Sequence, residues 1–199
     1  PIADPAGLMD AYETWNRALF ASPYPPTTRQ AHSVVPGAHA NLEDHGRVQG
    51  KNYTDPEYQL HWSRRWVEDS PKWRVRPVGG FNCDMSCHHE TVVTTGPLAG
   101  TTVSGYGGEI IQATGPNLGI DDPGVALAIT GMVDGLGLDG GEVPRNIAMV
   151  MEAYNTERLN QDEVDGLDLT WGNYEAVIEL LEKTVRREGI GASLAKPPR

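Results

Sequence analysis

Apolar residues recur at helical spacing in the first segment of the chain. Over residues 5–20 the apolar positions are three or four residues apart: Leu8, Tyr12, Trp15 and Leu19. Residues with this spacing share one face of an α-helix, so the pattern predicts an amphipathic helix over residues 5–20. Three prolines, at positions 23, 25 and 26, then end it.

Helix starts are marked by a dipeptide that occurs three times. Asp4-Pro5, Asp55-Pro56 and Asp122-Pro123 each place an N-cap residue before a proline at the first helical position. The second pair predicts a helix from Pro56 to about Val67. The third predicts a helix along which Val125, Ile129, Met132, Val133 and Leu136 form one face.

The last third of the chain predicts two more helices. One begins at Pro144, with Ile147, Val150, Met151 and Tyr154 in register. The other runs over residues 174–188 after an Asn173 cap, and Gly189 is the expected left-handed residue that stops it.

The middle of the chain shows the pattern of a small β-hairpin. Residues 91–95 are β-branched throughout, and residues 101–103 follow after turn residues, so the two stretches predict paired strands. Residues 69–87 carry two prolines and a Gly-Gly pair and are interpreted as a loop. We therefore expect one mainly α domain over residues 1–199, helical with a small hairpin.

Composition excludes several classes of function. The formal net charge is -11, which disfavours nucleic acid as a partner because phosphate binding needs clustered Lys and Arg. No stretch approaches the roughly 20 apolar residues that cross a bilayer, and no signal peptide opens the sequence. The chain has only 2 cysteines, which favours a reducing, cytoplasmic setting. Its first residue is proline, which is typical of a processed or excised piece.

Three motifs in the second half resemble one enzyme family. The first is Glu109 followed by residues 114–122 (TGPNLGIDD), and the second is residues 134–140 (DGLGLDG). The third joins residues 169–173 (LTWGN) to residues 185–191 (VRREGIG). In order and spacing they resemble the aldehyde:ferredoxin oxidoreductases, strongly over residues 104–195 and more weakly before them.

The resemblance implies a fold and an activity. Members of that family have three domains, and this chain resembles the second, helical one. The implied reaction is two-electron oxidation of an aldehyde to a carboxylate at a tungsten or molybdenum held by two pterins. Electrons would leave through a [4Fe-4S] cluster to ferredoxin. The implied partners are the flanking domains of the parent enzyme, ferredoxin and, as a further candidate, a second copy in a homodimer. We expect the isolated chain to be inactive.

The second motif is interpreted as a pterin contact. Asp134 and Asp139 flank the end of a helix and the turn after it, and their carboxylates offer acceptors to pterin N–H groups. Gly137 lets the chain turn close to a flat ligand, and Leu138 completes the contact. The plain alternative is a helix end with surface aspartates.

Glu109 is the candidate catalytic residue. The resemblance places it close to the metal, where a carboxylate hydrogen-bonds a metal-bound oxygen or water, or takes a proton as general base. The plain alternative is a solvated glutamate at the start of a helix.

Cys83 and Cys87 are the candidate metal ligands. They align with the last two cysteines of the family's C-x-x-C-x-x-x-C cluster motif, and its first position holds Gly80. Because a [4Fe-4S] cluster normally takes four thiolates, we do not expect this chain to hold one alone. Alternatives are a zinc site completed by His88 or His89, two reduced cysteines without metal, and a disulfide.

Two other functions stay open on the sequence. The chain is alternatively a stand-alone, non-catalytic helical module or a divergent remnant of the family, which the loss of the first cluster cysteine favours. A further option is a family member that reduces an aromatic thioester with the same cofactor.

Overall fold

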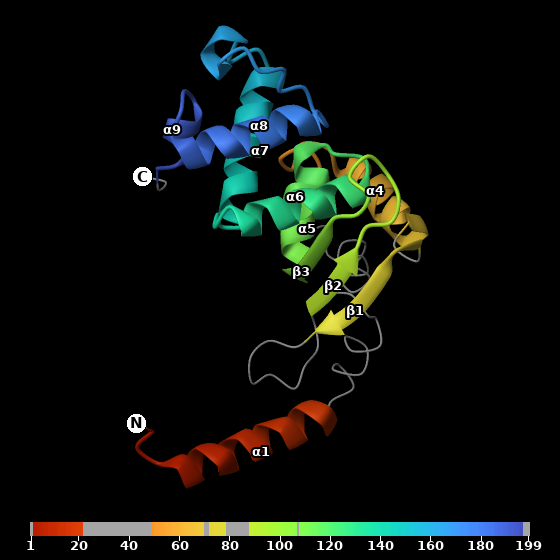
Figure 1. Cartoon of the computed structure of the whole chain (residues 1–199), viewed down its shortest axis with the longest axis vertical. Helices are drawn as coiled ribbons and strands as arrows, with labels where there is room; N and C mark the ends of the chain where they lie inside the picture. The colour runs from red at the N-terminus through yellow and green to blue at the C-terminus, as the bar shows by residue number, and fades with distance from the viewer. Residues whose placement is uncertain (1, 22–48, 70–71, 79–87, 107, 197–199) are drawn as a thin grey trace.

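The computed structural model describes residues 2–21, 49–69, 72–78, 88–106 and 108–196. The α-helices are α1 (Pro5–Ala21), α4 (Pro56–Asp69), α5 (Gly108–Thr114), α6 (Pro123–Gly135), α7 (Glu142–Asn155), α8 (Tyr174–Arg186) and α9 (Gly191–Leu194). Two 3-10 turns, η2 (Pro116–Leu118) and η3 (Asp162–Val164), and three strands complete it. Figure 1 shows helices α5 to α9 gathered at one end, the sheet beside them, and α1 at the opposite end.

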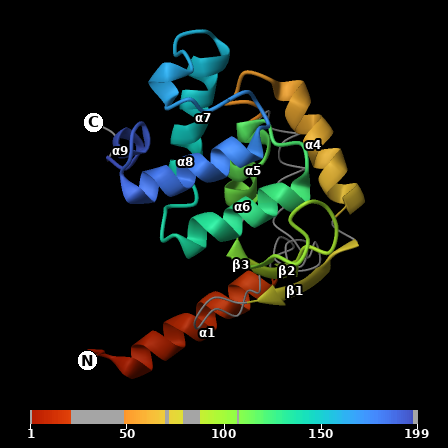
Figure 2. The ribbon, with the colours of Figure 1, turned by 45° about the horizontal axis from the view of Figure 1, so that its top comes forward.

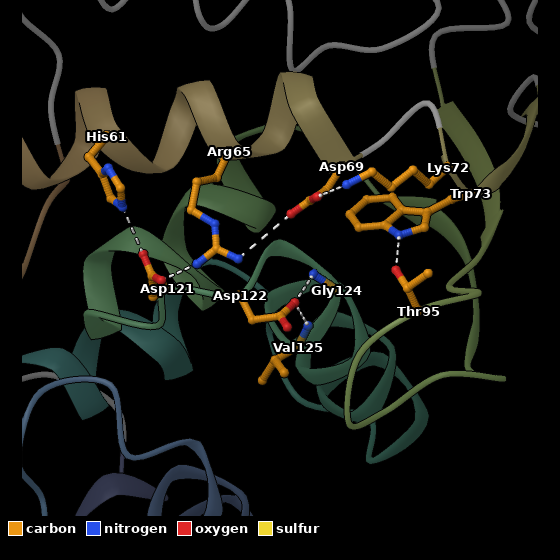
Figure 3. Close-up of polar contacts among 10 residues, drawn as sticks. All are labelled: His61, Arg65, Asp69, Lys72, Trp73, Thr95, Asp121, Asp122, Gly124 and Val125. Atoms are coloured by element: carbon orange, nitrogen blue, oxygen red, sulfur yellow. Dashed lines mark hydrogen bonds and ion pairs between the residues drawn. The ribbon is translucent and has the colours of Figure 1, made fainter.

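The three Asp-Pro pairs begin helices as predicted. Asp4 accepts a hydrogen bond from the backbone N–H of Gly7 at 2.9 Å, and Asp55 accepts one from Tyr58 at 2.9 Å. Asp122 accepts from the N–H groups of Gly124 and Val125, at 2.7 and 3.2 Å (Figure 3). Each carboxylate therefore satisfies donors that a helix start leaves unpaired, and the predicted starts are confirmed.

Helix α6 is the centre of the core. It is buried on almost every side, from Pro123 to Thr130 and again at Val133. Apolar side chains from α5, η2, α7 and α8 join it in one cluster, among them Ile111, Leu118, Ile147, Met151, Val177 and Leu181. Within the described ranges, no helix combines the length and the apolar composition that crossing a bilayer requires.

Three of the five tryptophans form the edge of this core. Trp62 and Trp66 on α4 have ring centroids 5.5 Å apart, and Trp73 meets Trp66 edge-on at 5.3 Å. All three are buried. Trp171 is half-buried, and Trp15 on α1 is exposed, so Trp15 does not serve the core.

The hairpin is present and belongs to a three-stranded antiparallel sheet of order β1-β2-β3. Strand β2 (His88–Val92) pairs with β3 (Thr102–Tyr106), with Thr91 opposite Val103, so the predicted pairing is confirmed. The bounds differ: β2 includes only residues 91–92 of the predicted stretch 91–95, and β3 begins at 102 and runs on to 106. Strand β1 (Arg74–Val78) lies in the stretch interpreted as a loop, so that interpretation was wrong there. Pro77 obscured it, because proline is tolerated in a strand at a sheet edge.

The C-terminal helices differ from the prediction at their ends. Helix α7 begins at Glu142, two residues before Pro144. Asn173 caps α8 as expected, accepting from Ala176 N–H at 3.2 Å. The left-handed residue that ends α8 is Arg187, with φ 56°, rather than Gly189. The short helix α9 was not predicted.

Candidate functional site

The candidate site is the connection between α6 and α7, residues 134–141, called here the α6–α7 bend. Helix α6 ends in a Schellman motif: Leu138 N–H donates to the Val133 carbonyl at 3.0 Å, and Gly137 N–H donates to the Asp134 carbonyl at 2.9 Å. Gly137 has φ +70°, a conformation that side chains disfavour. Glycine adopts this conformation without the strain that a side chain would bring, which favours it at the end of this helix.

Asp139 caps the next helix, a role that sequence reasoning missed. Its Oδ1 accepts from the backbone N–H groups of Gly141 and Glu142, at 2.9 and 2.6 Å. These bonds, Glu142 first, hold the pKa of the Asp139 carboxyl below its ordinary value. Asp139 is therefore a charged N-cap whose other oxygen, Oδ2, accepts no hydrogen bond from the described residues.

The remaining groups of the bend face outward. Asp134 is exposed, and its carboxylate accepts no hydrogen bond from any described residue. In the described part of the chain, no atom lies within 4 Å of where a Cβ would stand on Gly135 or Gly137. Leu138 is half-buried and packs against the core. Apart from Leu138, the bend thus presents two carboxylates beside an open glycine surface.

The bend lies against the start of helix α5, which carries Glu109. A Cβ on Gly140 would stand only 3.1 Å from Cγ2 of Ile110, the residue that follows Glu109. The fold therefore packs helix α5 against the bend through Ile110. The Glu109 side chain is outside the described part of the structure, and its catalytic role stays a prediction.

The candidate metal ligands also lie outside the described residues. Cys83, Cys87 and Gly80 belong to residues 79–87, which connect β1 to β2. Across the residues that are described, no group of three or more His, Cys, Asp and Glu side chains could hold a metal ion. The metal role of the two cysteines stays a prediction.

Two of the family-like motifs pack against each other. Gly172 N–H donates to the Leu118 carbonyl at 3.0 Å, and a Cβ on Gly172 would stand 2.7 Å from the Gly119 carbonyl oxygen. The Gly119 carbonyl also accepts from the Tyr58 hydroxyl at 2.5 Å. Burial raises the pKa of Tyr58, which keeps this donor protonated. The GPNLG and WGN stretches are therefore packing motifs.

Ion pairs that the sequence did not reveal hold α4 to the loop before α6 (Figure 3). Asp121 of that loop pairs with Arg65 and lies 3.1 Å from His61 Nε2. A separate local pair, Asp69 with Lys72 at 2.6 Å, lies at the end of α4. These side chains are partly or largely exposed, so each pair contributes on the order of 0–1 kcal/mol to stability.

Comparisons with known proteins agree with the motifs. The sequence model of the family described as aldehyde ferredoxin oxidoreductase, domains 2 and 3, matches residues 17–199. The tungsten-containing aldehyde ferredoxin oxidoreductase of Pyrococcus furiosus is 30% identical over 156 residues, which are 78% of this chain and 25% of the relative. The aliphatic sulfonate oxidoreductase, WOR-like subunit, of the same organism is 30% identical over 124 residues, 62% of this chain and 20% of that protein.

A solved structure is similar as well. The active site complex BamBC of benzoyl coenzyme A reductase, in complex with 1,5-dienoyl-CoA, matches 67% of this chain and 19% of its own chain. Its TM-score is 0.52 and its sequence identity 27%. The chain thus spans about a quarter or less of the length of these relatives.

Proposed function

Because this chain belongs to the aldehyde ferredoxin oxidoreductase family, we propose that it is the second, mainly helical domain of a larger cytoplasmic tungstopterin oxidoreductase. The proposed reaction is the oxidation of an aldehyde to a carboxylate. The observation that carries the proposal is the α6–α7 bend, whose carboxylates are open to a ligand next to the helix that carries Glu109.

The donors and acceptors of the bend fit a pterin. A pterin presents an amino group and ring N–H groups along one edge, and these need acceptors. Asp134 offers a whole carboxylate, and Asp139 offers Oδ2 while Oδ1 remains on the α7 backbone. The open surface at Gly135 and Gly137 leaves room for a flat ring, and Leu138 supplies an apolar contact. In this proposal Asp134, Gly137, Leu138 and Asp139 hold the pterin.

Glu109 is proposed to accept a proton. When bound, the bis-pterin tungsten or molybdenum group supplies the two-electron exchange with the substrate. Oxidation of an aldehyde with water to a carboxylic acid also releases two protons, so a carboxylate close to the reacting carbon serves as general base. Glu109 is the candidate because the residue after it, Ile110, contacts Gly140 of the bend.

Electron transfer needs groups beyond this chain. Ferredoxin is the proposed acceptor, reached through a [4Fe-4S] cluster. Cys83 and Cys87 offer two thiolates, and Gly80 stands where the family motif has its first cysteine. This chain alone would leave such a cluster two thiolates short, so the flanking domains have to complete it or the cluster is absent.

A second candidate reaction is the reduction of an aromatic thioester. It is favoured by the likeness to the active-site complex of benzoyl coenzyme A reductase over two thirds of this chain. Both reactions would use the same bend, so the bend does not distinguish them. The third reading, a stand-alone module without catalysis, predicts a natural protein that ends near Arg199.

The test is chemical analysis of the full-length natural protein, purified without oxygen. We expect tungsten or molybdenum with two pterins per metal, and dye reduction that depends on an aldehyde. Iron and acid-labile sulfide measure the cluster separately. Activity with benzoyl-CoA and none with aldehydes would select the second candidate. A full-length protein with neither metal, or a reading frame ending near Arg199, would overturn the proposal.

A further inference from the structure

The charged side chain of Arg145 lies on the α6–α7 bend. Arg145 is the fourth residue of α7 and is half-buried. Its Nη1 lies 2.9 Å, and its Cζ 3.9 Å, from the point where a Cβ would stand on Gly141, so the guanidinium folds back along the helix onto the bend. It forms no ion pair and no side-chain hydrogen bond with any residue that the structure describes. The bend therefore carries an unpaired cation.

The stability of the fold does not account for a cation at this place. The N-terminus of α7 is the positive end of its helix dipole, which disfavours a positive charge in the first turn. Glu142 stands three residues earlier, at a spacing that allows an ion pair within a helix, yet it does not pair with Arg145. A ligand with an acceptor at the bend would give this charge a partner.

Arg145 and Asp139 lie side by side without joining. Oδ1 of Asp139 is 3.4 Å from the same Cβ point on Gly141, but it accepts from the N–H groups of Gly141 and Glu142 rather than from the guanidinium. These two bonds and, to a smaller extent, the charge of Arg145 hold the pKa of the Asp139 carboxyl low. The bend therefore offers a ligand an ionised acceptor and a charged donor next to each other.

An acceptor beside a donor matches the polar edge of a pterin. That edge carries the 2-amino group and the ring N3–H, which are donors, and then the carbonyl oxygen O4, which is an acceptor. Guanine has the same edge, and arginine is the side chain that most often reads its carbonyl oxygen in DNA. Carboxylates satisfy the two donors and leave O4 without a partner. Arg145 is a donor suited to it.

The guanidinium and the two carboxylates meet at one place on the molecule. Figures 1 and 2 both show the bend at the end of α6 that is farther from α4, with α7 leading away from it. Resting on the pterin contact proposed above, we propose that Arg145 donates to the O4 carbonyl of the pterin that Asp134 and Asp139 hold. Arg145 is then a specificity-determining residue, which selects a pteridine with an oxygen at position 4.

The test compares two pteridines on the full-length natural protein prepared without its cofactor. One is pterin, and the other is 2,4-diaminopteridine, in which an amino group replaces O4; the fluorescence of each reports its binding. The wild-type protein should bind pterin at least roughly tenfold more tightly, the effect of one hydrogen bond to a charged group. Arg145→Met should lose this preference. Arg145→Glu should reverse it, because a carboxylate accepts from the 4-amino group.

Two controls separate lost recognition from a lost fold. Arg158→Met changes an exposed arginine beyond the other end of α7 and should keep the wild-type preference. Arg145→Glu places an acid in the first turn of α7, which the helix dipole favours, so its urea midpoint should not fall. An unchanged preference in both Arg145 variants would overturn this inference and leave the contacts of Asp134 and Asp139 standing. A wild-type protein that binds neither pteridine would overturn both.

Discussion

Two glycine-rich stretches of this protein resemble the same family but differ in environment. Residues 115–119 are buried, and the close approach of Gly119 and Gly172 leaves no room for a side chain. The α6–α7 bend is exposed at Asp134, Gly135, Gly137 and Asp139. Glycine serves backbone packing in the first stretch and an open surface in the second. A motif's resemblance to the family therefore does not by itself tell whether its residues pack the fold or are open to a ligand.

The largest predicted effect is on the buried stretch. In Gly172→Ala the new Cβ would stand 2.7 Å from the Gly119 carbonyl oxygen, at a residue with φ +88°. Steric overlap and left-handed strain together should lower the free energy of unfolding by about 3 kcal/mol. Urea unfolding of the isolated chain measures this change.

Gly100→Ala is the control that separates the two causes. Gly100 has φ +97° but no atom within 4 Å of its Cβ position in the described part of the chain, so the variant carries strain without overlap. We expect a loss of about 1 kcal/mol. If Gly172→Ala cost no more than Gly100→Ala, the packing role of the WGN stretch would be refuted.

A smaller effect distinguishes two exposed or half-exposed aspartates. Asp122 caps α6 through two backbone N–H groups, so Asp122→Ala should cost about 1 kcal/mol of stability. Asp134 bonds to no described residue through its carboxylate, so Asp134→Ala should change stability by less than about 0.5 kcal/mol. Thermal unfolding of both variants checks the difference, and equal losses would contradict an open bend.

The smallest effect is in the pH dependence of the Asp139 cap. Its pKa is lowered in the folded chain, so the charged cap stabilises fully above the ordinary value of 3.8 and loses its effect as pH falls through the lowered value. Asp139→Asn keeps a good cap without the charge. Urea midpoints should show wild type losing stability in acid relative to this variant. A difference that is constant from pH 5 to roughly pH 2.5 would contradict the charged cap.

The helix starts could be predicted because their causes are local. Asp4, Asp55 and Asp122 cap the helices that their Asp-Pro pairs predicted. A helix cap depends on only a few neighbouring residues, so the sequence contains its whole signal. Strand β1 could not be predicted from local signals, because it is defined by its pairing with β2, ten residues later in the sequence. Its proline, Pro77, also argues against a strand unless the strand lies at a sheet edge. The end of α8 at Arg187 was missed because glycine is the usual left-handed stop.

The position of the candidate site was only partly predictable. The end of α6 near Asp134 could be predicted from the glycine-rich DGLGLDG motif. The capping role of Asp139 could not, because Pro144 was expected to start α7, which begins at Glu142. The approach of the bend to α5 depends on Gly140 meeting Ile110, thirty residues earlier in the chain. Tertiary packing of this kind has no local signal in a single sequence.

The central claim is that the α6–α7 bend holds a pterin, and pterin content tests it directly. In the full-length protein, Asp134→Asn combined with Asp139→Asn should lose most of the bound pterin while the chain stays folded, since Asn still caps α7. Asp162→Asn, at an exposed aspartate on η3, is the matched control and should retain pterin. Full pterin content in the double variant would contradict the account.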